Sequence, residues 1–423
     1  MDTESLYRLY LEHPSIETDT RKLTPGQLFF ALKGPHFNGN LFAAKSLEMG
    51  AAYAVIDEKA YLSGDRMILV DDVLRSLQDL ARHHRDTFDI PFIAVTGSNG
   101  KTTTKELIRA VLATRYTTYA TEGNLNNHIG IPLTLLKIHR NVAMAVIEMG
   151  ANHQREIAGY CKIVNPTHGI ITNVGKAHLE GFGGIEGVRK GKGELFDHLR
   201  ANGGTAFACR DFDYFAEMTT GLKQVIWYGT GKQEHQAARI IRSHPFLELD
   251  SSFAGILQTH LVGDYNLYNV LGAVTIGEYF GVDRQKTADA IAAYTPNNAR
   301  SQLVQRGSNT IILDAYNANP SSMQAAIENF AAAPEHSKVL MLGAMMELGP
   351  ESPGEHQKLI ELIEKYRWKA VVLVGGDFVN TSHRYQYFPN AETAGKWLAG
   401  QGFQDTSILI KGSRSMAMEK VLG

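Results

Sequence analysis

The sequence of 423 residues has few of the features that mark several large classes of protein. Its two cysteines, Cys161 and Cys209, form no Cys-x-x-Cys pair and no cysteine–histidine cluster, so we expect two buried thiols in a reducing compartment. The formal net charge is only −2, which argues against binding nucleic acid through overall charge. No run of 18 apolar residues occurs, and the acidic start lacks the pattern of a signal peptide. These absences predict a cytoplasmic protein with no membrane span.

What the chain does contain is enough apolar sequence, 44% of its residues, for sizeable cores, and its length suggests two or three domains. Residues 1–86 hold short strands and helices. Residues 87–295 alternate apolar strands with helices, a pattern typical of a mainly parallel sheet. After an apparent linker at Thr295-Pro296-Asn297-Asn298, residues 296–423 alternate again. We therefore predict an α/β fold of three domains, the last one Rossmann-like.

The expected elements follow from apolar runs and helical spacing. We expect strands at 27–32, 52–56, 90–95, 142–148, 169–172, 224–228, 310–313, 338–342, 370–375 and 406–411, and helices at 101–113, 266–280, 321–332, 354–366 and 413–422.

One glycine-rich turn is the most informative motif. The segment Gly97-Ser98-Asn99-Gly100-Lys101-Thr102-Thr103 lies between a strand-length apolar run and a helical pattern. Backbone N–H groups at such a helix start bind phosphate, Lys101 would reach the outer phosphates, and the Thr102 hydroxyl would bind Mg²⁺. The common loop has glycine where this chain has Val95. The alternative, a plain glycine turn that caps a helix, lacks an explanation for the flanking strand, lysine and threonine.

Three further side chains are candidate metal ligands, each with a simpler alternative. Glu148 ends a buried strand, where ligands of open α/β sheets gather, and it would hold Mg²⁺ or be a solvated strand end. His178 follows another strand in a polar turn, as a second ligand or a surface histidine. Lys192 begins a predicted helix, either as a solvated cation or as a lysine that reacts with CO₂ to give an anionic carbamate.

The turn Asp314-Ala315-Tyr316-Asn317-Ala318-Asn319-Pro320 separates a predicted strand from a predicted helix. Asn-Pro followed by serine is a turn and helix-capping signal by itself. Two asparagines that face a cleft would also suit a zwitterionic peptide, because an amide both donates and accepts hydrogen bonds.

With these motifs the chain resembles the Mur ligases, the ATP-dependent amide-forming enzymes of peptidoglycan precursor synthesis. The segment 96–103 is common to these ligases and the folylpolyglutamate synthases. Segments 122–133, 316–323 and 411–416 are more selective, and resemble the member that joins D-alanyl-D-alanine to UDP-N-acetylmuramoyl-tripeptide. Segments 19–21 and 25–34 look like the UDP-sugar site of the family.

The resemblance implies two substrates besides ATP, an acyl-phosphate intermediate and two Mg²⁺ ions. It also implies that the protein is a monomer and carries out the last cytoplasmic step in the synthesis of the cell-wall precursor. It implies that residues 1–86 bind the UDP-sugar, residues 87–295 bind ATP and residues 296–423 bind the dipeptide. It implies Lys101, His178 and carbamylated Lys192 in catalysis, and Thr102, Glu148, His178 and Lys192 as metal ligands. For ATP it implies Gly97, Ser98, Asn99, Gly100, Lys101, Thr102, Thr103, Asn266, Asn269, Arg300 and Asp314. For the other substrates it implies Asp19, Thr20, Arg21, Lys33, Gly34, Asn124, Asn126, Asn127, Asn317, Asn319 and Arg414.

The chain departs from the family pattern at three places. Tyr265 replaces a histidine, Ala344 replaces an aspartate, and Leu313-Asp314 replaces a pair of aspartates while keeping the second. Two rival functions are a sister ligase that adds one amino acid and a nucleotide-dependent switch that hydrolyses ATP alone. The Asp-Asn-Pro-Arg motif of the sister is missing, and the UDP-site motif argues against a switch. The third residue of the tripeptide, diaminopimelate or lysine, stays open.

Overall fold

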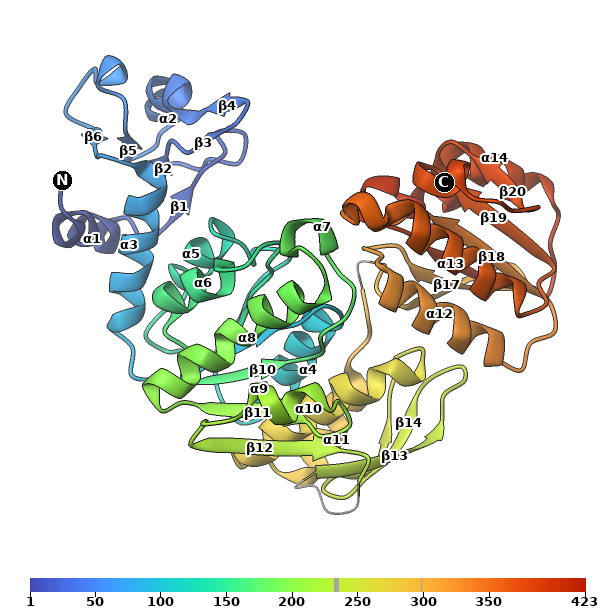
Figure 1. Ribbon diagram of the computed structural model, residues 1–423. Helices are drawn as coiled ribbons and strands as arrows, with labels where there is room; N and C mark the ends of the chain where they lie inside the picture. Colours follow the sequence, from blue (N-terminus) through green and yellow to red (C-terminus); the bar gives the residue numbers. More distant parts are fainter. Residues whose placement is uncertain (232–235, 298) are drawn as a thin grey trace.

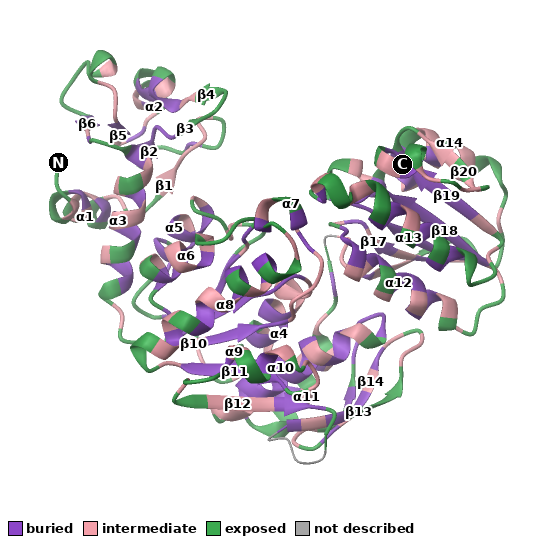
Figure 2. Ribbon diagram, in the orientation of Figure 1, coloured by how far each residue is buried: buried purple, intermediate pink, exposed green. Residues whose placement is uncertain are grey.

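Among the described residues, three large sheets, each built from one part of the chain, and one two-stranded hairpin form the framework of the protein (Figure 1). The structure is a computed structural model, and it describes residues 1–231, 236–297 and 299–423. The N-terminal and C-terminal parts lie at opposite ends above the large central sheet. Buried residues follow the strands and the inner faces of the helices (Figure 2). No helix among the described residues is long and apolar enough to cross a membrane.

The N-terminal part has a parallel four-stranded sheet in the order β1-β2-β5-β6. Its elements are α1 (Thr3–Glu12), β1 (Ile16–Glu17), β2 (Leu28–Phe30), the hairpin β3 (Lys33–Gly34) and β4 (Phe37–Asn38), α2 (Ala43–Glu48), β5 (Tyr53–Ile56), β6 (Met67–Leu69) and α3 (Val73–Asp86).

Helix α3 fixes this part to the central one through a buried arginine. The Arg85 guanidinium donates to the Val164 carbonyl oxygen (2.7 Å) and the Asn165 carbonyl oxygen (2.8 Å), and lies 4.0 Å from the ring centre of Phe92. These carbonyls end helix α6 (Glu156–Val164), where a cation is favoured by the helix dipole. The neighbouring His84 bonds to the Ile138 carbonyl oxygen at 2.7 Å.

The central sheet has nine strands in the order β15-β14-β13-β12-β11-β10-β7-β9-β8. Strand β7 lies between β10 and β9 and is parallel to both, so three carboxyl ends meet at one edge, where ligands bind in such sheets. Helices α4 and α10 pack together, as do α6 and α8. The remaining bounds are β7 (Phe92–Thr96), α4 (Lys101–Ala113), β8 (Thr118–Ala120), α5 (Gly130–Leu135), β9 (Met144–Glu148), β10 (His168–Ile171), α7 (Leu179–Phe182), α8 (Ile185–Asn202), β11 (Thr205–Cys209), α9 (Tyr214–Met218), β12 (Gln224–Gly229), β13 (Gln236–Arg242), β14 (Glu248–Ser251), β15 (Gly255–Gln258), α10 (Leu267–Tyr279) and α11 (Arg284–Ala293).

The C-terminal sheet has six strands in the order β16-β17-β21-β18-β19-β20, all parallel except the pair β16–β17. Its elements are β16 (Gln302–Arg306), β17 (Asn309–Asp314), α12 (Pro320–Ala332), β18 (Lys338–Gly343), α13 (Ser352–Glu364), β19 (Ala370–Val374), β20 (Gln386–Phe388), α14 (Ala391–Gly400) and β21 (Ser407–Lys411).

Most predicted elements are confirmed, and helix 101–113 has the predicted bounds. Both cysteines are free and buried, as expected. The predicted helix 413–422 is wrong: two short 3-10 segments, Arg414–Met416 and Met418–Leu422, replace it, because Ala417 between them has a left-handed backbone with φ 47°. The antiparallel strands β13–β15 were not predicted. Of the predicted linker, Asn298 lies outside the described residues.

Candidate active site

The glycine-rich turn after β7 has a shape that only glycine allows at two positions. Gly97 and Gly100 have φ values of 140° and 78°. A Cβ on Gly97 would lie 2.0 Å from the Thr172 hydroxyl oxygen, and one on Gly100 would lie 2.3 Å from Asn269 Oδ1. The turn therefore needs both glycines, for backbone conformation and for space.

The segment that follows β10 holds this turn in place. The backbone N–H of Ser98 donates to the Asn173 carbonyl oxygen and that of Asn99 to Asn173 Oδ1, both at 3.0 Å. The Ser98 hydroxyl donates to the Gly175 carbonyl oxygen at 3.0 Å. The turn is thus preorganised by a strand end distant in sequence.

Lys101, at the start of α4, folds back over the turn. Its Nζ donates to the carbonyl oxygens of Gly97 (2.8 Å) and Ser98 (3.2 Å). Desolvation lowers its pKa, the nearby Glu148 carboxylate opposes this, and Arg300 adds to the lowering. This places the amine at the mouth of the turn, where the outer phosphates of a nucleotide would lie.

Glu148 at the end of β9 is a buried carboxylate aimed at the same turn, with 2% of its surface exposed. Its oxygens accept from the Thr102 hydroxyl at 2.8 and 3.0 Å, and Oε1 also accepts from Asn126 Nδ2 at 2.8 Å. The solvated strand-end alternative is therefore wrong. Among the described residues no group of three or more His, Cys, Asp or Glu side chains could hold a metal. One carboxylate, one hydroxyl and phosphate oxygens are nevertheless a donor set that suits Mg²⁺.

The other residues of the 122–133 motif have different surroundings. Asn127 Oδ1 accepts from the N–H groups of Ile129 (3.1 Å) and Gly130 (2.8 Å), so it caps the start of α5. Asn124 is exposed. The one asparagine of this motif that reaches the turn is Asn126, through Glu148.

His178 precedes α7 and faces the C-terminal part. Its Nδ1 lies 2.5 Å from a Glu347 carboxylate oxygen, and this contact lowers the pKa of Glu347. Glu347 was not predicted from the sequence, because nothing local to residue 347 indicates a partner 169 positions away.

The prediction that Lys192 begins a helix is wrong, because Lys192 lies inside α8. It is 1% exposed, so the solvated-cation alternative is wrong as well. Its Nζ donates to the Ala151 carbonyl oxygen at 3.0 Å and lies 5.0 Å from the ring centre of Phe182. Burial, and then repulsion from Lys101, holds its pKa well below the usual value. A neutral amine is the form that reacts with CO₂.

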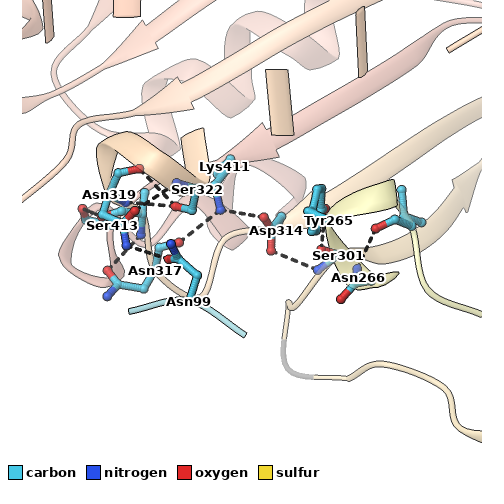
Figure 3. A network of polar contacts seen from close by, with 12 residues as sticks. Asn99, Tyr265, Asn266, Ser301, Asp314, Asn317, Asn319, Ser322, Lys411 and Ser413 are labelled. Carbon is cyan, nitrogen blue, oxygen red and sulfur yellow. Dashed lines mark hydrogen bonds and ion pairs between the residues drawn. The ribbon is translucent and has the colours of Figure 1, made fainter. Parts of the chain in front are cut away.

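Helix α10 packs against α4, and its residue Asn269 lies against Gly100 of the turn. Asn269 Oδ1 accepts from the Thr104 hydroxyl at 3.0 Å, and Asn269 Nδ2 donates to Asn266 Oδ1 at 2.8 Å. Both asparagines are buried. The phenol of Tyr265 bonds to the Ser301 hydroxyl at 3.0 Å (Figure 3).

The C-terminal part contributes an aspartate and two arginines. Asp314 Oδ2 lies 2.6 Å from Lys411 Nζ, and Oδ1 accepts from the Ser301 N–H at 3.0 Å (Figure 3). The guanidinium carbons of Arg300 and Arg414 lie 3.5 and 5.7 Å from the ring centre of Tyr316.

Asn319 has two roles at once. Its Oδ1 accepts from the Ser322 N–H at 2.9 Å, so it caps α12 as predicted, and its Nδ2 donates to Asn99 Oδ1 of the glycine-rich turn at 2.7 Å (Figure 3). Asn317 Oδ1 accepts from the Ala318 N–H at 2.9 Å. The structure thus brings the 316–323 motif and the glycine-rich turn together.

The predicted UDP-sugar residues lie apart from this site, in the N-terminal part. Arg21 pairs with Asp19 at 2.7 Å, with Thr20 between them, and its hydrogen bonds lower the pKa of Asp19 to about 2. Lys33, beside Gly34 on the β3–β4 hairpin, lies 3.1 Å from Asp57.

Comparisons with known proteins agree with this arrangement. The sequence model of the Mur ligase middle domain matches residues 95–277, and that of the Mur ligase glutamate ligase domain matches residues 299–414. The UDP-N-acetylmuramoyl-tripeptide–D-alanyl-D-alanine ligases of Bacillus subtilis and Escherichia coli are 33% and 35% identical to this chain, each over 96% of it and 92% of the relative. The crystal structure of MurF ligase from Thermotoga maritima in complex with ADP superposes with a TM-score of 0.86 at 27% identity, covering 97% of each chain.

Proposed function

This chain belongs to the Mur ligase family, and we propose that it joins D-alanyl-D-alanine to UDP-N-acetylmuramoyl-tripeptide with ATP, in the cytoplasm and as a monomer. The observation that carries the proposal is the meeting of two motifs. Asn319 of the turn that resembles the dipeptide-adding ligases bonds directly to Asn99 of the nucleotide loop. Relatives aligned over nearly the whole chain carry the same activity in their names.

We further propose three domains with separate tasks. Residues 1–86 bind the UDP-sugar through Asp19, Thr20, Arg21, Lys33 and Gly34. Residues 87–295 bind ATP, and residues 296–423 bind the dipeptide, with Asn317, Asn319 and Arg414 facing it. Arg300 and Asp314 approach ATP from the third domain.

The chemical problem is that a carboxylate is a poor electrophile. In the proposed reaction an oxygen of the tripeptide carboxylate attacks the γ-phosphorus of ATP, and ADP leaves. The amine of D-alanyl-D-alanine then attacks the acyl carbon, phosphate leaves, and the nitrogen gives up a proton. Lys101 neutralises charge on the transferred phosphoryl group. No protein nucleophile is needed.

Metal and lysine chemistry complete the proposed site. Thr102 and Glu148 would hold one Mg²⁺, and His178 with carbamylated Lys192 a second; the ions would offset repulsion between the carboxylate and the phosphates. The carbamate forms when the neutral amine of Lys192 attacks CO₂ and loses a proton. The burial of Lys192 and its lowered pKa support this step, because both favour the neutral amine.

Turnover assays test the function. Phosphate release with ATP and UDP-N-acetylmuramoyl-tripeptide should rise strongly with D-alanyl-D-alanine, and mass spectrometry should detect the pentapeptide product. Equal stimulation by free diaminopimelate or lysine on the dipeptide precursor would favour the sister ligase, and ATP hydrolysis without a UDP-substrate would favour a switch. Tripeptides ending in diaminopimelate and in lysine should be compared, to identify the third residue.

A further inference from the structure

The loop after β10 forms a further contact with the C-terminal part, next to the asparagine pair Asn99–Asn319. The Lys176 backbone N–H donates to the Ser321 hydroxyl at 2.9 Å. At Gly175 an added Cβ would lie 2.9 Å from that same hydroxyl oxygen, so the backbone of Gly175 packs directly against the side chain of Ser321. Residues 175–176 therefore lie against the first turn of α12.

An ion pair reinforces this contact. The side chain of Glu355 on α13 is 5% exposed, and its Oε1 accepts from Lys176 Nζ at 2.7 Å and from Lys358 Nζ at 2.8 Å. Lys358 belongs to the same helix as Glu355, whereas Lys176 comes from the central part. One buried carboxylate oxygen thus has two cationic partners, and just one of these pairs crosses the interface.

The loop that carries Lys176 also supports the nucleotide turn. Gly175 bonds to the Ser98 hydroxyl through both its N–H (2.9 Å) and its carbonyl oxygen (3.0 Å). The placement of the C-terminal part and the shape of the nucleotide turn consequently depend on the same few residues.

We propose that Lys176 is a positioning residue, whose ion pair with Glu355 holds the acceptor turn 316–321 over the nucleotide turn. This inference rests on the proposed function, since it assigns the acceptor turn to the dipeptide. Without the ion pair, the arrangement of the two parts that binds the dipeptide is less populated. The apparent affinity for the dipeptide falls in proportion to that population. The apparent affinity for ATP falls little, because ATP is bound mainly by the central part.

The test compares two matched variants that each remove one cation from Glu355. Lys176→Met should raise the KM for D-alanyl-D-alanine about 5- to 10-fold, as expected for a charge-assisted contact whose lysine is partly exposed, while kcat and the KM for ATP change less than about twofold. Small-angle scattering with ADP bound should give a larger radius of gyration. Lys358→Met should leave all four quantities within about twofold or unchanged, and Lys176→Arg should restore the KM.

Three results would overturn the proposal. The first is equal effects of the two methionine variants, and the second is an unchanged KM for D-alanyl-D-alanine together with an unchanged radius of gyration in Lys176→Met. The third is a raised kcat in Lys176→Met, which would show that the ion pair slows the reaction. In a Glu355→Gln background, Lys176→Met should have no further effect. If the wild-type protein does not ligate the dipeptide, the proposed function fails, while the scattering comparison still decides whether Lys176 holds the two parts together.

Discussion

Replacing Lys192 with methionine separates the structural cost of a buried amine from its chemical use. The side chain is 1% exposed and its Nζ has the Ala151 carbonyl oxygen as an acceptor at 3.0 Å. Methionine has a similar length and no charge. In CO₂-free buffer without nucleotide, we expect Lys192→Met to raise the free energy of unfolding by about 1–4 kcal/mol, the range seen when well-packed apolar residues replace buried ionic groups.

The pH dependence of this gain has a definite sign. Because the pKa of Lys192 is lowered in the folded state, the unfolded chain binds the proton more tightly, and the wild type is penalised below the unfolded pKa of about 10.4. The penalty disappears as the pH rises through that value. The stability advantage of Lys192→Met, measured by denaturant unfolding, should therefore be large at pH 7 and shrink toward pH 10.

The ligation activity of Lys192→Met should fall although its stability rises. Removing the proposed carbamate from the phosphoryl-transfer site should lower the ligation rate by about 10²–10³ in Lys192→Met and Lys192→Ala. In Lys192→Ala short carboxylates such as acetate should restore part of the rate, since they supply the missing oxygens. Lys192→Arg should stay inactive, because a guanidinium cannot be carbamylated.

A fully active Lys192→Arg would contradict a carbamate at Lys192, and so would a Lys192→Met protein that is both active and less stable. The same holds if the wild type, with ATP and carbon-13-labelled bicarbonate, shows no carbamate signal in its carbon-13 NMR spectrum. The first two results would leave Lys192 a structural residue of α8.

Three further predictions concern the rest of the site and its support. Lys101→Ala should lower ligation and ATP turnover by about 10²–10³ with an unchanged circular dichroism spectrum, and activity within a few-fold of the wild type would contradict the phosphate-loop assignment. Gly100→Ala should abolish ATP binding in calorimetry, because its φ is 78° and the new Cβ would meet Asn269; an unchanged affinity would show that the turn can relax. Arg85→Ala should lower the free energy of unfolding by about 3 kcal/mol, since buried charge-assisted bonds are lost, whereas the exposed Arg75→Ala should stay within about 0.5 kcal/mol; equal effects would contradict the anchoring role.

Local patterns were sufficient for the nucleotide turn. The apolar run, the glycines and the helical spacing are all contained in about 25 consecutive residues, so strand, turn and helix are specified without distant contacts. The same holds for Glu148, which ends a strand visible as one apolar run. Parallel strands then bring their carboxyl ends to one edge, and this geometric rule was enough to predict that Glu148 faces the turn.

The surroundings of Lys192 could not be predicted in this way. The start of α8 depends on Gly184, whose φ is 102°, and the burial of Lys192 depends on packing against Phe182 and Ala151 from other elements. A short window that contains Lys190 and Lys192 suggests a solvated face, and only the tertiary structure shows that the two lysines point in different directions: Lys190 is exposed and Lys192 is buried.

The contacts between the parts of the chain lie furthest beyond sequence patterns, and the proposed chemistry depends on them most. Asn99 and Asn319 are separated by 220 positions, and Lys176 and Glu355 by 179. Each of these residues has an ordinary local explanation: a turn, a helix cap, a loop cation, a helix surface. In the proposed reaction one sheet activates the carboxylate and another delivers the amine, so neither half can form the amide alone. An acyl phosphate exposed to water would be hydrolysed before the amine arrived. The chemistry therefore requires that a few polar side chains fix the second sheet over the first, and these side chains can be recognised only when both sheets are seen together.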